Sequence, residues 1–135
     1  MQRFFEEVFN QKRLDRAEAF VAWDYLDHAA VPGQGPGLAG AKQQRWARYF
    51  AAIPDLHATI DAPLGRGGQA GGALHGRGHA TGGAAGRPPT RRHFRTSAIC
   101  IYRLAEGKLA EVWEQTDLLG LMQQLDVLPA RESVR

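Results

Sequence analysis

The sequence predicts an α+β fold, because helical patterns come first and strand patterns follow instead of alternating with them. Apolar residues at helical spacing occur at 4–9, 14–20 and 40–53, and alternating patterns follow at 56–60, 94–102 and 109–116. One further helical pattern begins at Leu118. A parallel α/β fold would instead repeat strand, helix and strand along the chain.

The longest predicted helix spans 40–53. Its apolar side chains recur about once per turn, at Trp46, Tyr49, Phe50 and Ile53, and Pro54 ends it. Before this helix, we expect a short extended piece at 23–30, which carries His28. The Pro- and Gly-rich run at 31–37 is predicted to be a loop.

Residues 107–125 combine a turn, a strand and a helix. The strand carries β-branched, aromatic and polar side chains up to Thr116, and the helical spacing starts at Leu118. Asp117 lies at the switch between them. It is either the N-cap of the helix or a carboxylate at the mouth or floor of a pocket, and the two roles are compatible. Strand alternation counted from Asp117 puts Glu111 and Trp113 on its face.

Length and composition favour one domain over residues 1–135. The net charge is +3 and the pI about 9.4, but the basic residues lack interleaved aromatics or a known motif, so we expect no nucleic-acid partner. No apolar run reaches membrane-spanning length and no export leader precedes the first helix, so we expect a cytoplasmic protein. Cys100 is predicted to be a core residue.

Residues 63–86 fit neither period and contain ten of the sixteen glycines. From the residues alone they are a long loop, which is unusual inside a compact domain. A phosphate cradle is excluded, because no GxGxxG or GxxxxGK[ST] pattern lies between a strand and a helix. The histidines suggest no metal site, because they lack ligand spacing with acids or cysteine.

Several motifs, in order and spacing, resemble the SnoaL-like polyketide cyclases and ester cyclases of the nuclear-transport-factor-2-like superfamily. These motifs are Phe9-Asn10, Asp27-His28, Ile53-Pro54-Asp55-Leu56-His57, Pro88-Pro89-Thr90 and the Glu-x-Trp-x-x-x-Asp stretch within 107–125. The resemblance implies a cone, in which three N-terminal helices wrap a curved antiparallel sheet around a pocket. It also implies a strand pair where this chain has 63–86.

The unusual residues at 63–87 have a simple hypothetical origin. In GC-rich codons, a one-base shift would read Gly65-Arg66-Gly67-Gly68 as Val-Ala-Glu-Gly, which matches the pattern of the resembling family. We therefore hypothesise that the segment is out of frame, with a compensating shift downstream. Resequencing the coding DNA tests this, and the hypothesis fails if no single-base change restores an alternating apolar pattern.

The resemblance implies catalysis without metal or cofactor, in which Asp117 moves a proton next to a carbonyl and promotes an intramolecular aldol closure. Such a carboxylate has to be partly buried among apolar groups, so that its pKa rises toward neutrality. Trp113 and Leu121 are near enough in the sequence to supply that environment. His28 is the candidate hydrogen-bond donor to the enolate, or else a loop histidine packed at the rim of the pocket.

The candidate substrate-binding residues are aromatic or apolar: Trp113, Tyr102, Phe50, Trp46, Tyr25 and Leu121. Core packing is the competing role for Trp46 and Phe50. The hydroxyls of Tyr25 and Tyr102 either contact a polar ligand or belong to amphipathic core residues.

Two functions remain open. The first is a cofactor-independent cyclase, isomerase or hydrolase that acts on a small hydrophobic, polyketide-like carbonyl compound. The second is a non-catalytic module of the same fold, which binds a small hydrophobic molecule or dimerises; the resemblance also implies a homodimer. An Asp117 carboxylate inside an apolar pocket would favour the enzyme, and one that only caps a helix into solvent would favour the module.

Overall fold

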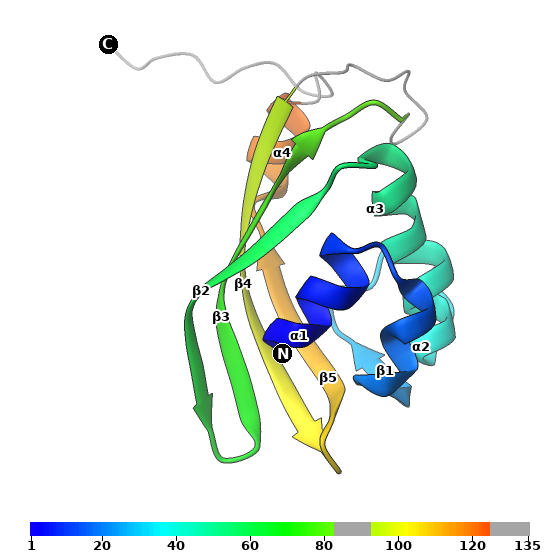
Figure 1. Ribbon diagram of the computed structural model, residues 1–135, viewed down its shortest axis with the longest axis vertical. Helices are drawn as coiled ribbons and strands as arrows, with labels where there is room; N and C mark the ends of the chain where they lie inside the picture. Colours follow the sequence, from blue (N-terminus) through cyan, green and yellow to red (C-terminus); the bar gives the residue numbers. More distant parts are fainter. Residues whose placement is uncertain (83–92, 125–135) are drawn as a thin grey trace.

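The computed structural model describes residues 1–82 and 93–124, and its five strands form one curved sheet that does not close on itself (Figure 1). The strands lie side by side in the order β1-β5-β4-β3-β2. Their bounds are β1 (Val21–Asp27), β2 (His57–Arg66), β3 (Gln69–His79), β4 (His93–Ala105) and β5 (Lys108–Thr116). The α+β prediction is confirmed.

The helices cover one face of this sheet, which we call the inner face; the opposite face is the outer face (Figure 1). Two of the predicted helices are built from contiguous pieces. The first is α1 (Gln2–Phe4) followed by η1 (Phe5–Asn10), and the long one is α2 (Gly37–Gly40), η3 (Ala41–Trp46) and α3 (Ala47–Ala52). Between them lies the 3-10 helix η2 (Leu14–Ala19), and α4 (Leu118–Gln124) follows β5. Within the described residues, each helix is too short or too polar to cross a membrane.

The predicted extended piece at 23–30 is part of an edge strand. It forms β1, which pairs with β5 in parallel, whereas the three other strand pairs are antiparallel. Parallel pairing is possible because the long helix and the strands β2, β3 and β4 lie between β1 and β5 in the chain and provide the long connection that it requires. The pairing places Asp27 opposite Val112, near the middle of β5.

The core lies between the helices and the inner face. Along β4 the buried side chains alternate with exposed ones, so that Phe94, Ala98, Cys100 and Tyr102 point inward. Phenylalanines of the first helix pack against Trp46 and Tyr102, and the ring centroids of Phe4 and Trp46 are 5.4 Å apart. Cys100 is buried, as the sequence predicts.

The Gly-rich segment forms a hairpin of β2 and β3, where the resemblance implies a strand pair and the residues alone suggest a loop. Residues 61–66 of β2 are all exposed and bury no apolar side chain. This part of the hairpin is therefore held together by backbone hydrogen bonds between β2 and β3. Gly67 and Gly68 make the two-residue turn with φ values of +57° and +77°, which a type I′ turn requires.

This hairpin provides a stability test with a matched control. At Gly65 a new Cβ would meet only Gln69 O at 3.6 Å, so Gly65→Thr should raise the free energy of unfolding. The gain should be about 0.5–1 kcal/mol, since a glycine inside a strand costs that much. Gly67→Thr should instead lower it by about 1–2 kcal/mol, because φ is positive there. Urea denaturation measures both, and equal effects at the two positions would contradict this account.

Candidate active site

An apolar cavity of about 120 Å³ lies between the helices and the inner face of the sheet. Its walls come from the first helix, the long helix, β4 and α4, and include Phe5, Phe9, Trp46, Tyr49, Ile53, Phe94, Ala98, Tyr102, Leu118 and Leu121. Cavities of roughly 150 Å³ hold a molecule the size of benzene, so this one has room for a single ring.

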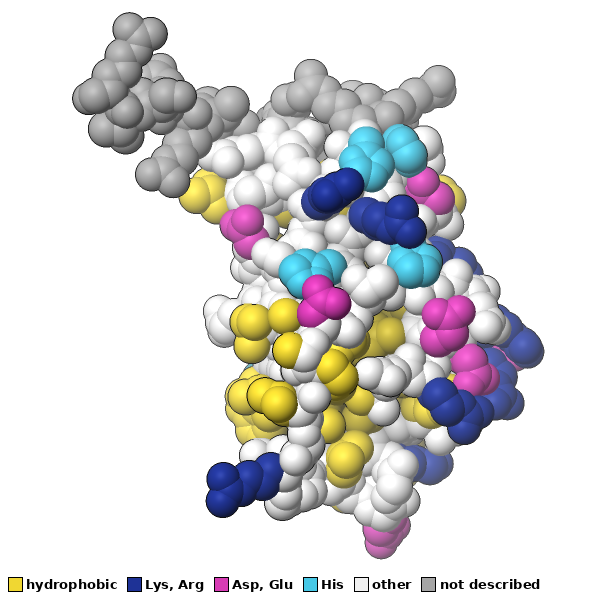
Figure 2. Space-filling view, turned by 60° about the vertical axis from the view of Figure 1, so that its left-hand side comes forward, with side chains coloured by type: hydrophobic (Ala, Val, Ile, Leu, Met, Phe, Trp, Pro, Cys, Tyr) yellow, Lys and Arg dark blue, Asp and Glu magenta, His cyan; other side chains and the backbone are white. Residues whose placement is uncertain are grey.

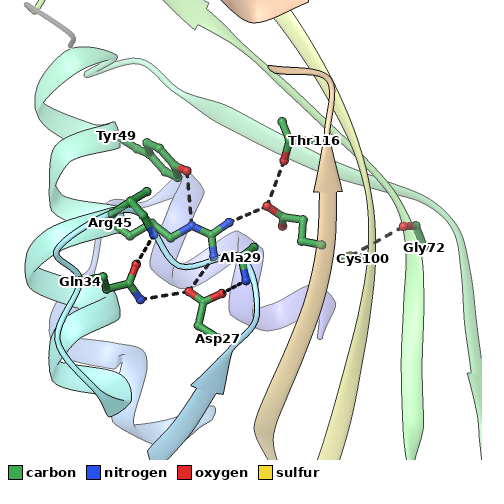
Figure 3. A network of polar contacts seen from close by, with 10 residues as sticks. Asp27, Ala29, Gln34, Arg45, Tyr49, Gly72, Cys100 and Thr116 are labelled. Carbon is green, nitrogen blue, oxygen red and sulfur yellow. Dashed lines mark hydrogen bonds and ion pairs between the residues drawn. The ribbon is translucent and has the colours of Figure 1, made fainter. Parts of the chain in front are cut away.

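One wall of the cavity carries a buried charge network centred on Arg45 (Figure 3). The Arg45 guanidinium donates to Asp27 Oδ2 at 2.9 Å and to Glu114 Oε2 at 2.6 Å. Only 7% of the Arg45 side chain, 4% of Asp27 and 10% of Glu114 are exposed. Arg45 Nε also donates to the Tyr49 hydroxyl at 3.3 Å. Two carboxylates therefore share one buried cation, and the cluster can accept a proton without creating an unpaired positive charge.

The carboxylates of Asp27 and Glu114 differ in how many of their oxygens accept hydrogen bonds. Asp27 accepts from the Ala29 backbone at 2.9 Å and from Gln34 at 3.1 Å, so both its oxygens are bonded (Figure 3). Glu114 Oε2 accepts from Arg45 and from the Thr116 hydroxyl at 3.2 Å. For Glu114 Oε1, no hydrogen bond is found within the described residues, and Glu114 lines the cavity. Its second oxygen is thus the carboxylate atom available to a ligand.

The ionisable neighbours of Glu114 have shifted pKa values. Burial disfavours the charged form of Arg45, but Tyr49, Glu114 and Asp27 outweigh that penalty, so the pKa of Arg45 lies above its ordinary value. Burial, assisted by nearby carboxylates, raises the pKa of both Tyr25 and Tyr102 well above 10.0. Both phenols line the cavity and remain neutral hydrogen-bond donors at physiological pH.

The raised tyrosine pKa values imply alkaline instability. A phenol whose folded pKa exceeds its unfolded value stabilises the fold below the unfolded pKa, and this contribution is lost as the pH rises above it. The free energy of unfolding should therefore fall as the pH rises above about 10. Urea denaturation and phenolate absorbance measure it, with Tyr25→Phe as a less pH-sensitive control. Phenolate absorbance from all three tyrosines of the folded chain would contradict it.

The structure places Asp117 at the N-terminus of α4, with its side chain exposed. Its Oδ1 accepts a hydrogen bond from the Gly120 backbone at 2.9 Å, which is the N-cap geometry. The following residues Leu118 and Leu121 line the cavity, but Asp117 is not among the lining residues.

His28 and Trp113 lie together on the outer face, away from the cavity. Their rings stack with centroids 5.0 Å apart, and His28 Nε2 lies 2.5 Å from Glu111 Oε2. Glu111 also accepts a hydrogen bond from Arg103 at 2.8 Å. The hydrogen bond with His28, and to a smaller extent the one from Arg103, hold the pKa of Glu111 below its ordinary value. Glu111, which strand alternation puts on the face of Asp117, is not among the residues that line the cavity; Glu114 lines it from the opposite face of β5.

Four of the six predicted substrate-binding residues line the cavity: Trp46, Tyr25, Tyr102 and Leu121. Trp113 does not, since it faces outward. Phe50 is also not among the lining residues; it packs edge-on against Phe9 at 5.4 Å, with Lys12 over its ring. The structure therefore brings the predicted aromatic wall together, but separates it from Asp117 and His28.

Residues 1–125 match the family described as SnoaL-like polyketide cyclase. The chain belongs to this family.

Solved structures related to this SnoaL-like chain share its fold over nearly the whole length. TsrD from Streptomyces laurentii is 25% identical with a TM-score of 0.82, covering 93% of this chain and 95% of its own. A proposed polyketide cyclase from Acidithiobacillus ferrooxidans is 25% identical with a TM-score of 0.80, covering 93% and 90%. IdmH from Streptomyces antibioticus, also a proposed polyketide cyclase, is 25% identical with a TM-score of 0.75, covering 89% and 91%. No curated protein sequence matches the chain.

Sequence reasoning missed the charge network of this SnoaL-like cyclase family member. A usable signal was the place of Arg45, four residues after Ala41 and four before Tyr49, on the apolar face of the predicted helix. An arginine buried there requires carboxylate partners. In residues 1–82 and 93–124, no group of three His, Cys, Asp or Glu is arranged to hold a metal ion.

Proposed function

We propose that the chain is a cofactor-independent enzyme of the cyclase or isomerase type, which transfers a proton on a small hydrophobic, polyketide-like carbonyl compound. The observation that carries this proposal is the Glu114 carboxylate. It lines an apolar cavity, Arg45 and Thr116 fix one of its oxygens, and the other oxygen is free of hydrogen bonds from the described residues.

The chemistry needs one base and one donor. Glu114 takes a proton from the carbon next to a carbonyl, and the enolate oxygen receives a hydrogen bond from the neutral phenol of Tyr25 or Tyr102. In a cyclase, the enolate carbon attacks a second carbonyl carbon of the same molecule. The new carbon–carbon bond forms, and the alkoxide oxygen takes a proton from the Glu114 carboxyl. In an isomerase, the proton returns to a different carbon.

Asp117 and His28, the pair that the resemblance implies, form the competing assignment. Two facts favour Glu114 over Asp117: it is nine-tenths buried, and it lies in the cavity wall. If Asp117 acts only as a helix cap, and Glu114 only as a structural partner of Arg45, the chain is a module that binds small hydrophobic molecules. The exposed N-cap geometry of Asp117 is the observation that favours this second function.

A cavity-blocking variant tests the enzyme proposal. A short open-chain β-polyketo ester serves as the substrate, and the loss of its ketone groups is followed. Leu121→Trp should fill the cavity and abolish turnover, whereas Leu119→Trp on the same helix should not, because Leu119 is 58% exposed and outside the lining. Turnover that survives Leu121→Trp would overturn the proposal. Stabilisation by the substrate without turnover would favour the binding module.

We also infer that the outer face pairs with a second copy of the chain. Ile99, Ile101 and Trp113 are 60%, 44% and 39% exposed, and hydrophobic side chains gather on that face (Figure 2). Light scattering should give a dimer that Ile101→Glu converts to a monomer. A monomeric parent chain would contradict the inference.

A further inference from the structure

A band of basic side chains crosses the outer face of the sheet at the end nearest α3 and α4. His57 of β2 pairs with Arg77 of β3, and Arg77 pairs with Arg95 of β4, so the three form one row across three strands. The next row is Thr59, His75 and Ser97. In Figure 2, His and Lys or Arg side chains gather on this face above the hydrophobic patch.

The row places two arginines at paired positions of neighbouring strands. Like charges at paired positions of neighbouring strands repel, which destabilises the pair unless an opposite charge lies between them. The ion pairs found within the described residues join neither Arg77 nor Arg95 to a carboxylate. Two acids on this side of the fold pair with histidines instead, Asp61 with His75 at 3.1 Å and Asp55 with His79 at 2.6 Å.

The surface is hollowed where these side chains meet. His57, Thr59, His75, Gly76, Arg77, Arg95 and Thr96 line a groove there.

One residue of the groove, Arg95, is held in place through its backbone by α4. Arg95 lies in the part of β4 that does not pair with β5. The Gln124 side chain of α4 accepts a hydrogen bond from the Arg95 backbone N–H and donates one to the Arg95 carbonyl, both at 2.7 Å. His57 Nδ1 is buried without a partner in the described part of the chain.

We propose that this groove binds a phosphate group, either as inorganic phosphate or as part of a small phosphomonoester. The two guanidinium groups provide planar pairs of donors that match phosphate oxygens, and His57 and Thr59 add donors at the side. A bound dianion would also neutralise the repulsion between Arg77 and Arg95. The site lies on the other side of the sheet from the cavity and is independent of the proposed catalytic function.

Titration calorimetry with the full chain at constant ionic strength tests this site. Inorganic phosphate and phenyl phosphate are the two probes, and tighter binding of phenyl phosphate would identify the phosphomonoester as the better ligand. The double variant Arg77→Gln/Arg95→Gln should weaken binding of both probes by about tenfold or more, since charged hydrogen bonds are lost. The control Arg48→Gln/Arg66→Gln removes the same charge outside the groove and should bind like the parent chain.

Ser97→Glu is a second variant. It keeps both arginines but places a carboxylate beside the groove, and it should weaken phosphate binding to a similar extent. Circular dichroism establishes that each variant is folded. Absence of phosphate binding to the parent chain would overturn the proposal, as would equal weakening in the control. Arg95 lies outside the Gly-rich segment 63–87, so the single variant Arg95→Gln tests the groove independently of that segment. Unchanged phosphate binding in the folded Arg95→Gln variant would overturn the proposal as well.

Discussion

Replacing Arg45 with methionine is expected to lower the free energy of unfolding by about 3–5 kcal/mol at neutral pH. Methionine has a similar length and keeps the apolar contacts with the helix, but removes the cation. Asp27 and Glu114 would then be two buried carboxylates without the guanidinium that lies 2.9 Å and 2.6 Å from them. Urea denaturation of the parent and variant chains measures the difference. Arg48→Met, at an exposed position of the same helix, is the control and should change stability little.

The pH dependence of the Arg45→Met variant separates this electrostatic cause from a loss of packing. Without the cation, burial and mutual repulsion would raise the pKa of both orphaned carboxyls in the folded state. A group with a raised folded pKa stabilises the fold at low pH and loses that contribution as the pH rises. The deficit should therefore shrink between about pH 7 and pH 5, and Glu114→Gln added to the variant should recover part of it. A deficit that is constant with pH would show that packing, and not charge, was lost.

The sequence predicts the order of elements well, because it depends on local patterns. The helical spacing at Trp46, Tyr49 and Ile53 and the alternation along β4 are each confirmed in place. The start of β2 matches the strand pattern predicted at 56–60, but the rest of the hairpin of β2 and β3 was not predictable from its own residues. Gly and Arg carry no periodic signal, and the strands form because β4 provides a neighbour for backbone pairing along the whole of β3.

The candidate site was predicted less well, for a reason that lies in residue parity. Counting by twos from Asp117 selects Glu111, but Asp117 is itself exposed and outside the cavity lining, so the count starts on the wrong face of β5. Counting from Val112, which pairs with the buried Tyr102, selects Glu114. The Arg45–Asp27 contact joins the long helix to β1, and no local pattern in the sequence reports such a pairing.

The variants Glu114→Gln and Asp117→Asn form a pair that decides which carboxylate transfers the proton. Glutamine keeps the size of Glu114 and an oxygen for the Arg45 bond, but cannot act as a base. We expect turnover of the polyketone to fall by about 10²–10⁴-fold. Asparagine caps a helix about as well as aspartate, so Asp117→Asn should leave both stability and turnover nearly unchanged.

Ligand affinity, measured through the shift in the melting temperature, should remain near that of the parent chain in both variants, because neither substitution changes the volume of the cavity. This separates loss of chemistry from loss of binding. The opposite result, in which Asp117→Asn abolishes turnover and Glu114→Gln does not, would establish the assignment that the family resemblance implies. It would then require α4 to turn the Asp117 carboxylate from its bond with the Gly120 backbone toward the neighbouring cavity when a ligand binds.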